Sequence, residues 1–208
     1  MKPRLRGWFH EVAFFVSIPA GLALIALARG AAAEVSAVIF AIGITGLYGV
    51  SALYHRGNWS VRKERVMKYL DHSMIFVLIA ASYTPLALLA LRPATGITLL
   101  VLAWVGAGVG IVVTIARLDR WRGLGLAMYL GLGWLVVVAA PQLFTALSRP
   151  ELVLLITGGV LYTVGAVVLA SNRPNPWPKT FGYHEVWHTF VIGAGVCHYA
   201  LVLLLVRA

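Results

Sequence analysis

Residues 97–116 have the sequence ITLLVLAWVGAGVGIVVTIA, twenty consecutive residues without a charged side chain. A transmembrane helix needs about 20 predominantly apolar residues to cross about 30 Å of hydrocarbon, so this stretch is long enough to span a bilayer. Six further apolar runs occupy most of the chain. The seven runs lie at 13–28, 35–54, 69–91, 97–116, 124–147, 152–170 and 184–206. The sequence therefore predicts an all-α membrane protein, a bundle of seven transmembrane helices.

The composition excludes most other classes of protein. Of the 208 residues, 61% are hydrophobic and 12% are charged, about half the charged share of a soluble domain. A soluble globule of this size cannot bury so much apolar surface, and disordered chains are far more polar. The single cysteine, Cys197, excludes an intramolecular disulfide. Seven spans leave room only for short loops, so we expect one transmembrane domain over residues 1–208.

The net charge of +10 comes from basic residues concentrated in alternate loops. Only four basic residues fall on the side of the bundle opposite the N-terminus, and thirteen fall on the side of the N-terminus. These thirteen are Lys2, Arg4, Arg6, Arg56, Arg62, Lys63, Arg65, Lys68, Arg117, Arg120, Arg122, Arg173 and Lys179. The positive-inside rule then predicts a cytoplasmic N-terminus and an external C-terminus. We expect a multi-pass protein of the plasma (inner) membrane whose partners are lipids, not nucleic acid, and whose oligomeric state stays open.

Glycine and proline predict local features of the spans. The glycines at 106, 108 and 110 resemble a weak dinucleotide fingerprint, but no strand precedes them, so we expect close helix packing instead. Pro19, Pro85 and Pro141 lie inside spans and should kink them. The proline-rich segment 173–178 should form a stiff extended connector.

Ionisable side chains at the ends of the spans are the functional candidates, because they are costly in a membrane. Ser51 and His55 end the second span, Asp71 opens the third, and His184 and His188 open the seventh. The predicted topology brings all three ends to the cytoplasmic face. Residues four apart on a helix differ by about 40° of rotation, so each such pair faces one way. His55, Asp71, His184 and His188 should therefore meet at one depth.

This set of side chains suits a metal ion. Zinc accepts imidazole ligands in a tetrahedral site, and a catalytic site keeps one position open. We assign His55, His184 and His188 as ligands, with Asp71 holding or deprotonating the water and Ser51 orienting the water or the substrate. Bound zinc lowers the pKa of water to about 7. Iron and manganese accept the same ligands, although a histidine-rich set favours zinc.

A second pattern overlaps the last two histidines. Residues 184–188 have the sequence HEVWH, which matches the H-E-x-x-H signature of metalloproteases with Glu185 as general base. An intramembrane metalloprotease of this kind would use Asp71 as its third ligand. Alternatively, Glu185 is a first-turn acid that complements the helix dipole.

The remaining polar residues near the spans have less specific patterns. His72 points about 100° away from Asp71, which predicts a packing or supporting role. His198 lies about 21 Å deeper than His184, so it cannot share the metal and should be a core histidine. His10 and Glu11 begin the first span, where an interfacial role and a gate near the site are both open.

Three stretches resemble the bacterial hemolysin III family, which is related to the progestin and adiponectin receptors and, with the alkaline ceramidases, is grouped among membrane hydrolases. They are SALYH at 51–55, LDHSMIF at 70–76 with YTP at 83–85, and the segment 174–188 with WP and FGYHE; CH at 197–198 is also similar. The resemblance covers nearly the whole chain. It implies seven helices with the N-terminus inside. The motif WFHE at 8–11 departs from the acidic, Asn- and Thr-His-containing first helix of many members.

The family pattern S-x3-H, an Asp in the third helix and H-x3-H in the last implies the same site. Carried onto this sequence, it makes His55, His184 and His188 zinc ligands and places Asp71 and Ser51 around the water or substrate. The resemblance implies a zinc-dependent hydrolase that cleaves an amide or ester bond of a ceramide-like lipid. The alternative is a non-enzymatic, zinc-containing receptor or sensor, or a hemolysin-type membrane-perturbing protein. An intramembrane metalloprotease is the third hypothesis.

Overall fold

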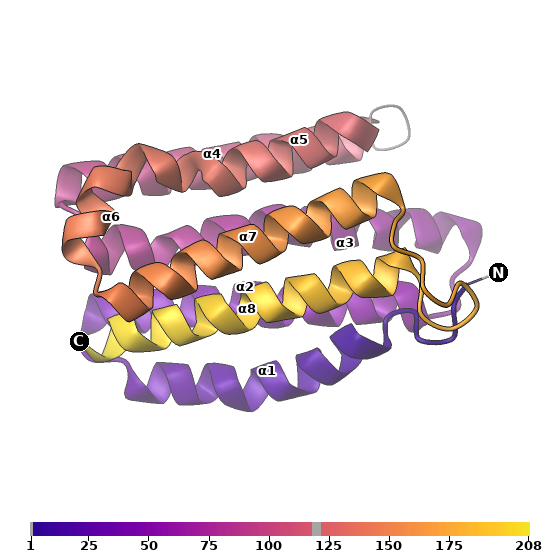
Figure 1. Cartoon of the computed structure of the whole chain (residues 1–208), viewed down its shortest axis with the longest axis horizontal. Coiled ribbons are helices and arrows are strands. Elements are labelled where there is room, and N and C mark those ends of the chain that lie inside the picture. Colours follow the sequence, from indigo (N-terminus) through magenta and orange to yellow (C-terminus); the bar gives the residue numbers. More distant parts are fainter. Residues whose placement is uncertain (1, 118–121) are drawn as a thin grey trace.

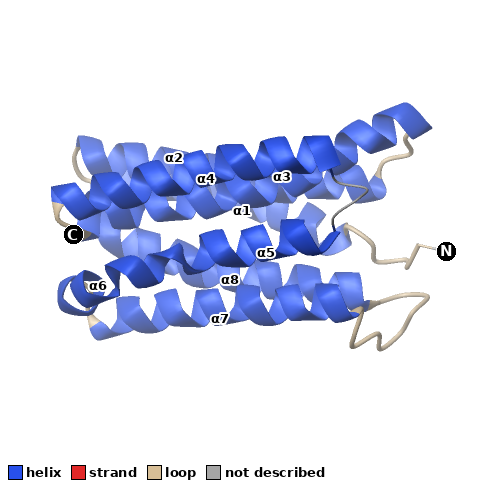
Figure 2. Cartoon of the chain, turned by 90° about the horizontal axis from the view of Figure 1, so that it is seen from above, coloured by secondary structure: helices blue, strands red, loops and turns tan. Residues whose placement is uncertain are grey.

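A computed structural model describes residues 2–117 and 122–208; Arg120, one of the basic residues counted above, lies outside these ranges. The described chain is a bundle of helices aligned along one long axis (Figure 1). The helices are α1 (Trp8–Leu27), α2 (Ala31–Arg56), α3 (Val61–Pro85), α4 (Pro93–Arg117), α5 (Arg122–Gly133), α6 (Ala140–Ala146), α7 (Arg149–Ser171) and α8 (Tyr183–Arg207). Figure 2 shows the same bundle from above, with loops only between helices and at the ends.

Seven helical segments of the described residues are long and apolar enough to cross a membrane, which confirms the seven expected spans. Five spans are single helices. The third continues from α3 through a π-helical turn, Leu86–Ala90, and the fifth joins α5 to α6 through a 3₁₀ segment, Trp134–Ala139. The chain is therefore a multi-pass integral membrane protein.

The interruptions of the third and fifth spans coincide with two of the prolines. Pro85 directly precedes the π-helical turn, and Pro141 is the second residue of α6, which follows the 3₁₀ segment. Proline has no N–H to donate, and its ring clashes with the carbonyl four residues earlier, so the regular hydrogen-bond ladder cannot continue unchanged. By contrast, α1 stays α-helical through Pro19. Residues 173–182 are not helical, as their prolines predict.

Helix α8 occupies a central position, because it contacts α7, α1, α2 and α3. Its Val191 and Val202 are buried with Phe40 of α2 in one core cluster, and its Leu201 is buried with Phe76 of α3 in a second. Both clusters are apolar, as expected for helix packing in a membrane. Helix α8 is thus packed against both α2 and α3.

Two of the three glycines at 106, 108 and 110 confirm the expected close packing. A β-carbon at Gly106 would collide with Leu132 of α5, and one at Gly110 would collide with Phe76 of α3. Gly108 has nothing within 4 Å of the position of a β-carbon. Small residues therefore let α4 approach its two neighbours closely.

The two chain termini lie at opposite ends of the bundle, in keeping with seven spans (Figures 1 and 2). The N-terminal segment runs along the loop between α7 and α8. The backbone N–H groups of Arg4 and Leu5 donate to the carbonyl oxygens of Lys179 and Thr180 at 3.0 and 3.1 Å. These contacts close one end of the bundle. The assignment of this end to the cytoplasm stays a prediction from charge.

Candidate metal centre

Three histidines meet at the end of the bundle that carries the N-terminal segment. His55 lies in the last turn of α2, and His184 and His188 lie in the first two turns of α8. One nitrogen from each of the three rings lies within 4.8 Å of the other two. Because α2 ends where α8 begins, residues 129 positions apart in sequence come together.

The distances fit a shared ion. The Nε2 atoms of His55 and His184 face each other at 3.1 Å. Two nitrogens bonded to a tetrahedral zinc at about 2.0–2.1 Å lie roughly 3.3 Å apart, so little movement is needed. The Nδ1 atom of His188 is buried and has no hydrogen-bond partner within the described chain. Since buried polar atoms normally have partners, the three histidines could hold a metal ion.

Asp71 and Ser51 lie at the same cluster. The Ser51 hydroxyl is within hydrogen-bonding reach of the Asp71 carboxylate, and this carboxylate acts electrostatically on His55 and His184. Asp71 Oδ2 is also 3.4 Å from Nδ1 of the half-buried His72. The structure thus brings the three expected ligands together, and the charge of Asp71 acts on two of them. Their roles in a reaction stay predictions.

The beginning of α3 differs from its expected position. The helix begins at Val61, whereas the apolar run begins at 69, so Asp71 lies inside a helix and not at its first turn. The reason is that Arg62, Lys63 and Arg65 are exposed and helical although they are charged. The hydropathy pattern marks the membrane-embedded part of a helix and misses polar turns outside it.

His10 is a member of this cluster that the sequence did not place. Its ring is stacked on His188, with centroids 3.8 Å apart and planes 9° from parallel. The residue is only 3% exposed, and neither ring nitrogen has a hydrogen-bond partner among the described residues. Because α1 begins at Trp8 and not at 13, His10 lies inside the helix and is buried against His188.

Glu185 is occupied by structural contacts. Its Oε2 accepts a hydrogen bond from the N–H of Gly182 at 2.7 Å, and its Oε1 forms an ion pair with Arg6. The side chain is fully buried. Glu185 therefore caps α8 and fixes the N-terminal segment, which agrees with the helix-dipole interpretation. Both carboxylate oxygens are engaged, and this disfavours Glu185 as the base of a metalloprotease.

The N-terminal segment lies directly against the site. Gly7 adopts a left-handed backbone conformation with φ 79°, and a β-carbon there would come within 2.7 Å of the His55 β-carbon. The next turn is fixed by an ion pair between Glu11 and Arg56 at 2.5 Å. Glycine at position 7 thus allows both the turn and the close approach.

His198 is outside the metal-ligand group, as its depth predicts. Its ring contacts Tyr162 of α7, with centroids 5.5 Å apart. It also lies against Gly158, where a β-carbon would collide with the imidazole. His198 therefore packs α8 against α7, away from the three candidate ligands.

Comparison with known proteins gives matches over nearly the whole chain. The sequence model of the family described as Haemolysin-III related matches residues 1–199. The Hemolysin-3 homolog of Bacillus subtilis (strain 168) is 37% identical over 197 residues, which cover 93% of this chain and 89% of that protein. Hemolysin-3 of Bacillus cereus is 34% identical over 197 residues, with 93% and 87% covered. The Heptahelical transmembrane protein ADIPOR2 of Oryza sativa subsp. japonica is 28% identical over 181 residues, 79% of each chain.

Proposed function

The chain belongs to the Haemolysin-III related family, and we propose that it is a zinc-dependent membrane hydrolase that cleaves an amide or ester bond of a lipid. One observation carries the proposal: His55, His184 and His188 converge inside a membrane-spanning bundle, and the charge of Asp71 acts on His55 and His184. Three histidines and an open fourth position are typical of catalytic zinc. A nearby carboxylate supplies the general base that such a site needs.

The protein residues would divide the chemistry among them. The three histidines would hold the zinc, which would polarise a carbonyl oxygen and lower the pKa of a bound water. Asp71 takes a proton from the attacking water and returns it to the leaving group. Ser51, within hydrogen-bonding reach of Asp71, orients the carboxylate or the oxygen of the substrate. The apolar core below the site keeps bulk water away from these groups.

The place of the site favours a lipid as substrate. The histidines lie at the ends of membrane spans, at the depth where the hydrocarbon core meets the headgroup region. The amide and ester bonds of lipids lie in this region. A cavity of about 390 Å³ extends inside the bundle and includes Trp187, the neighbour of His188, in its wall. This cavity is apolar enough for an alkyl chain of a ceramide-like substrate.

The test is hydrolysis by purified protein loaded with zinc. We expect release of fatty acid from a ceramide or a glycerolipid in mixed micelles, and loss of this activity in Asp71→Ala with the metal content unchanged. The control is Glu64→Ala, which removes an exposed carboxylate from the same helix. Turnover that persists in Asp71→Ala, or none in the wild-type protein with either lipid, would contradict the proposal.

A non-enzymatic receptor or sensor is the second candidate function. The observation that favours it is the contact of Gly7 with His55, which puts the N-terminal segment over the candidate ligands. In that case the metal would tie α2 to α8 and support a binding surface. Metal-dependent stability without hydrolysis of any lipid would distinguish this function.

A further inference from the structure

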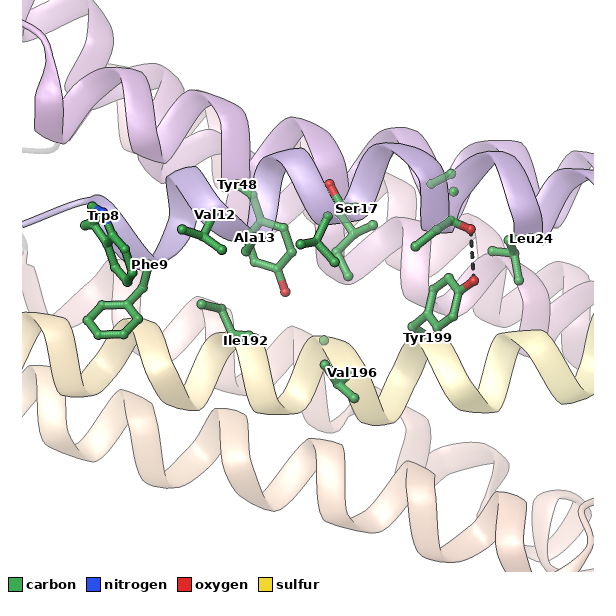
Figure 3. A pocket seen from close by; sticks show the side chains of 16 residues that line it. Trp8, Phe9, Val12, Ala13, Ser17, Leu24, Tyr48, Ile192, Val196 and Tyr199 are labelled. Atoms are coloured by element: carbon green, nitrogen blue, oxygen red, sulfur yellow. Dashed lines mark hydrogen bonds between the residues drawn. The ribbon is translucent and has the colours of Figure 1, made fainter.

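A second apolar space lies on the other side of α8 from the bundle interior. It is a groove of about 450 Å³ between α1 and α8, with α2 behind it (Figure 3). Its wall runs from Trp8 to Leu24 along α1 and from Ile192 to Tyr199 along α8. Sixteen residues of helix rise by about 24 Å, so the groove is long and narrow.

The groove is open toward the lipid. Val12, Val16 and Val196 line it and are 44%, 61% and 62% exposed. In an integral membrane protein, this exposed surface faces acyl chains instead of water. Helix α1 lies at the edge of the bundle, against α2 and α8 (Figure 1). A lipid can therefore enter the groove sideways from the bilayer.

One hydroxyl group in the groove wall has no hydrogen-bond partner among the described residues. Of the three hydroxyl groups there, Ser17 donates to the carbonyl oxygen of Phe14 at 2.8 Å and Tyr199 donates to that of Ala20 at 2.9 Å. Tyr48 is only 4% exposed and makes no hydrogen bond within the described chain. Figure 3 shows its hydroxyl pointing into the space between α1 and α8. A hydroxyl without a partner on a groove that faces acyl chains instead of water is costly, which indicates a ligand that accepts its hydrogen bond.

We propose that this groove binds one acyl chain of a membrane lipid, with the Tyr48 hydroxyl donating a hydrogen bond to the ester carbonyl oxygen at the head of that chain. The tail extends along α1 toward Leu24. The head lies beside the candidate metal centre, because the Tyr48 ring is 5.2 Å from the ring of His10. This binding requires neither metal nor hydrolysis, so it can be tested independently of the proposed function.

Photolabelling tests the position of the chain. The probe is a 1-palmitoyl glycerol with a diazirine at mid-chain, added to the whole protein in phosphatidylcholine nanodiscs with EDTA present, so that the assay measures binding alone. After irradiation, peptide mapping should find the label in residues 8–24 and 192–199. Label confined to α5 and α7, which line the other cavity, or spread evenly over lipid-facing residues, would overturn the proposal.

Three variants test the residues. Tyr48→Phe removes only the hydroxyl and should lower labelling at subsaturating probe about fivefold, the range expected for one hydrogen bond. Val196→Trp fills the groove and should lower labelling to background. The control, Val167→Trp, lies on α7 at a similarly exposed position, 58% exposed and outside the groove wall, and should label like the wild-type protein. Wild-type labelling in either Tyr48→Phe or Val196→Trp would contradict the proposal.

Discussion

The imidazole ring of His10 lies flat on the ring of His188, with centroids 3.8 Å apart. This stack connects the first helix to the last at the candidate metal centre. His188 is thereby held from one side by His10 and from others by His55 and His184, whose ring centroids are 5.1 and 4.6 Å away. Groups that orient a metal ligand generally affect affinity nearly as much as the ligands themselves.

Replacement of His10 tests this stack. His10→Ala removes the ring and should weaken zinc affinity about tenfold, because His188 is then free to rotate. His10→Phe keeps an aromatic face and should bind zinc almost as well as the wild-type protein. Competition with a chromophoric chelator measures the zinc affinities of both variants. If His10→Phe were as weak as His10→Ala, a nitrogen of His10 and not its stacking would be the important feature.

Gly7→Ala should weaken the metal centre, although Gly7 is not one of its candidate ligands. The left-handed conformation costs about 1–2 kcal/mol with a side chain, and the new β-carbon would press on His55. We expect a lower melting temperature and weaker zinc binding. Gly30→Ala is the matched control, since Gly30 also has a positive φ, 88°, but nothing within 4 Å. Equal zinc affinity in the two variants would show that Gly7 does not support His55.

Glu185→Gln should affect stability and leave the metal bound. Loss of the ion pair with the Arg6 side chain is expected to cost about 1.5–3 kcal/mol, the range for hydrogen bonds to charged groups. Glu151→Gln is the control, because Glu151 caps α7 in the same way, accepting from the Ser148 N–H at 2.7 Å, and has no arginine partner in the described chain. Thermal unfolding in detergent measures the stabilities of both variants. A Glu185→Gln protein as stable as Glu151→Gln, with hydrolysis abolished, would restore the protease hypothesis.

The orientation in the membrane can be measured with single cysteines in a Cys197→Ser background. Lys63→Cys lies at the end of the bundle with the N-terminus, and Arg92→Cys lies in the turn before α4 at the other end. Both positions are exposed. A membrane-impermeant maleimide added to intact cells should label Arg92→Cys only. Labelling of Lys63→Cys alone would reverse the assigned topology.

The sequence predicted the spans well because each is a long apolar run, and length and hydropathy suffice to identify a transmembrane helix. It was less accurate at helix ends. The basic first turns of α3 and the Trp8–Val12 turn of α1 are helical although they are polar or interfacial. Pro141 indicated an interruption of the fifth span, but the hydropathy pattern did not give its form, the 3₁₀ segment Trp134–Ala139.

The sequence likewise predicted one part of the candidate site and missed another. Charge asymmetry and i, i+4 spacing were enough to bring His55, His184 and His188 to one depth. The stack of His10 on His188 was missed because a histidine one turn into an interfacial segment shows no periodic pattern. Its signal would have been the start of α1 at Trp8, which turns His10 inward. Tyr48 gave no signal, because a tyrosine in an apolar run resembles any core aromatic residue.

Metal content per chain tests the central claim most directly. Detergent-purified protein, prepared without chelators, should contain about one zinc per chain by elemental analysis. His184→Ala/His188→Ala should contain none, and His198→Ala, which removes a histidine of α8 outside the ligand group, should retain the wild-type content. No metal in the wild-type protein, or equal metal in the double variant, would contradict the assignment of His55, His184 and His188 as a metal centre.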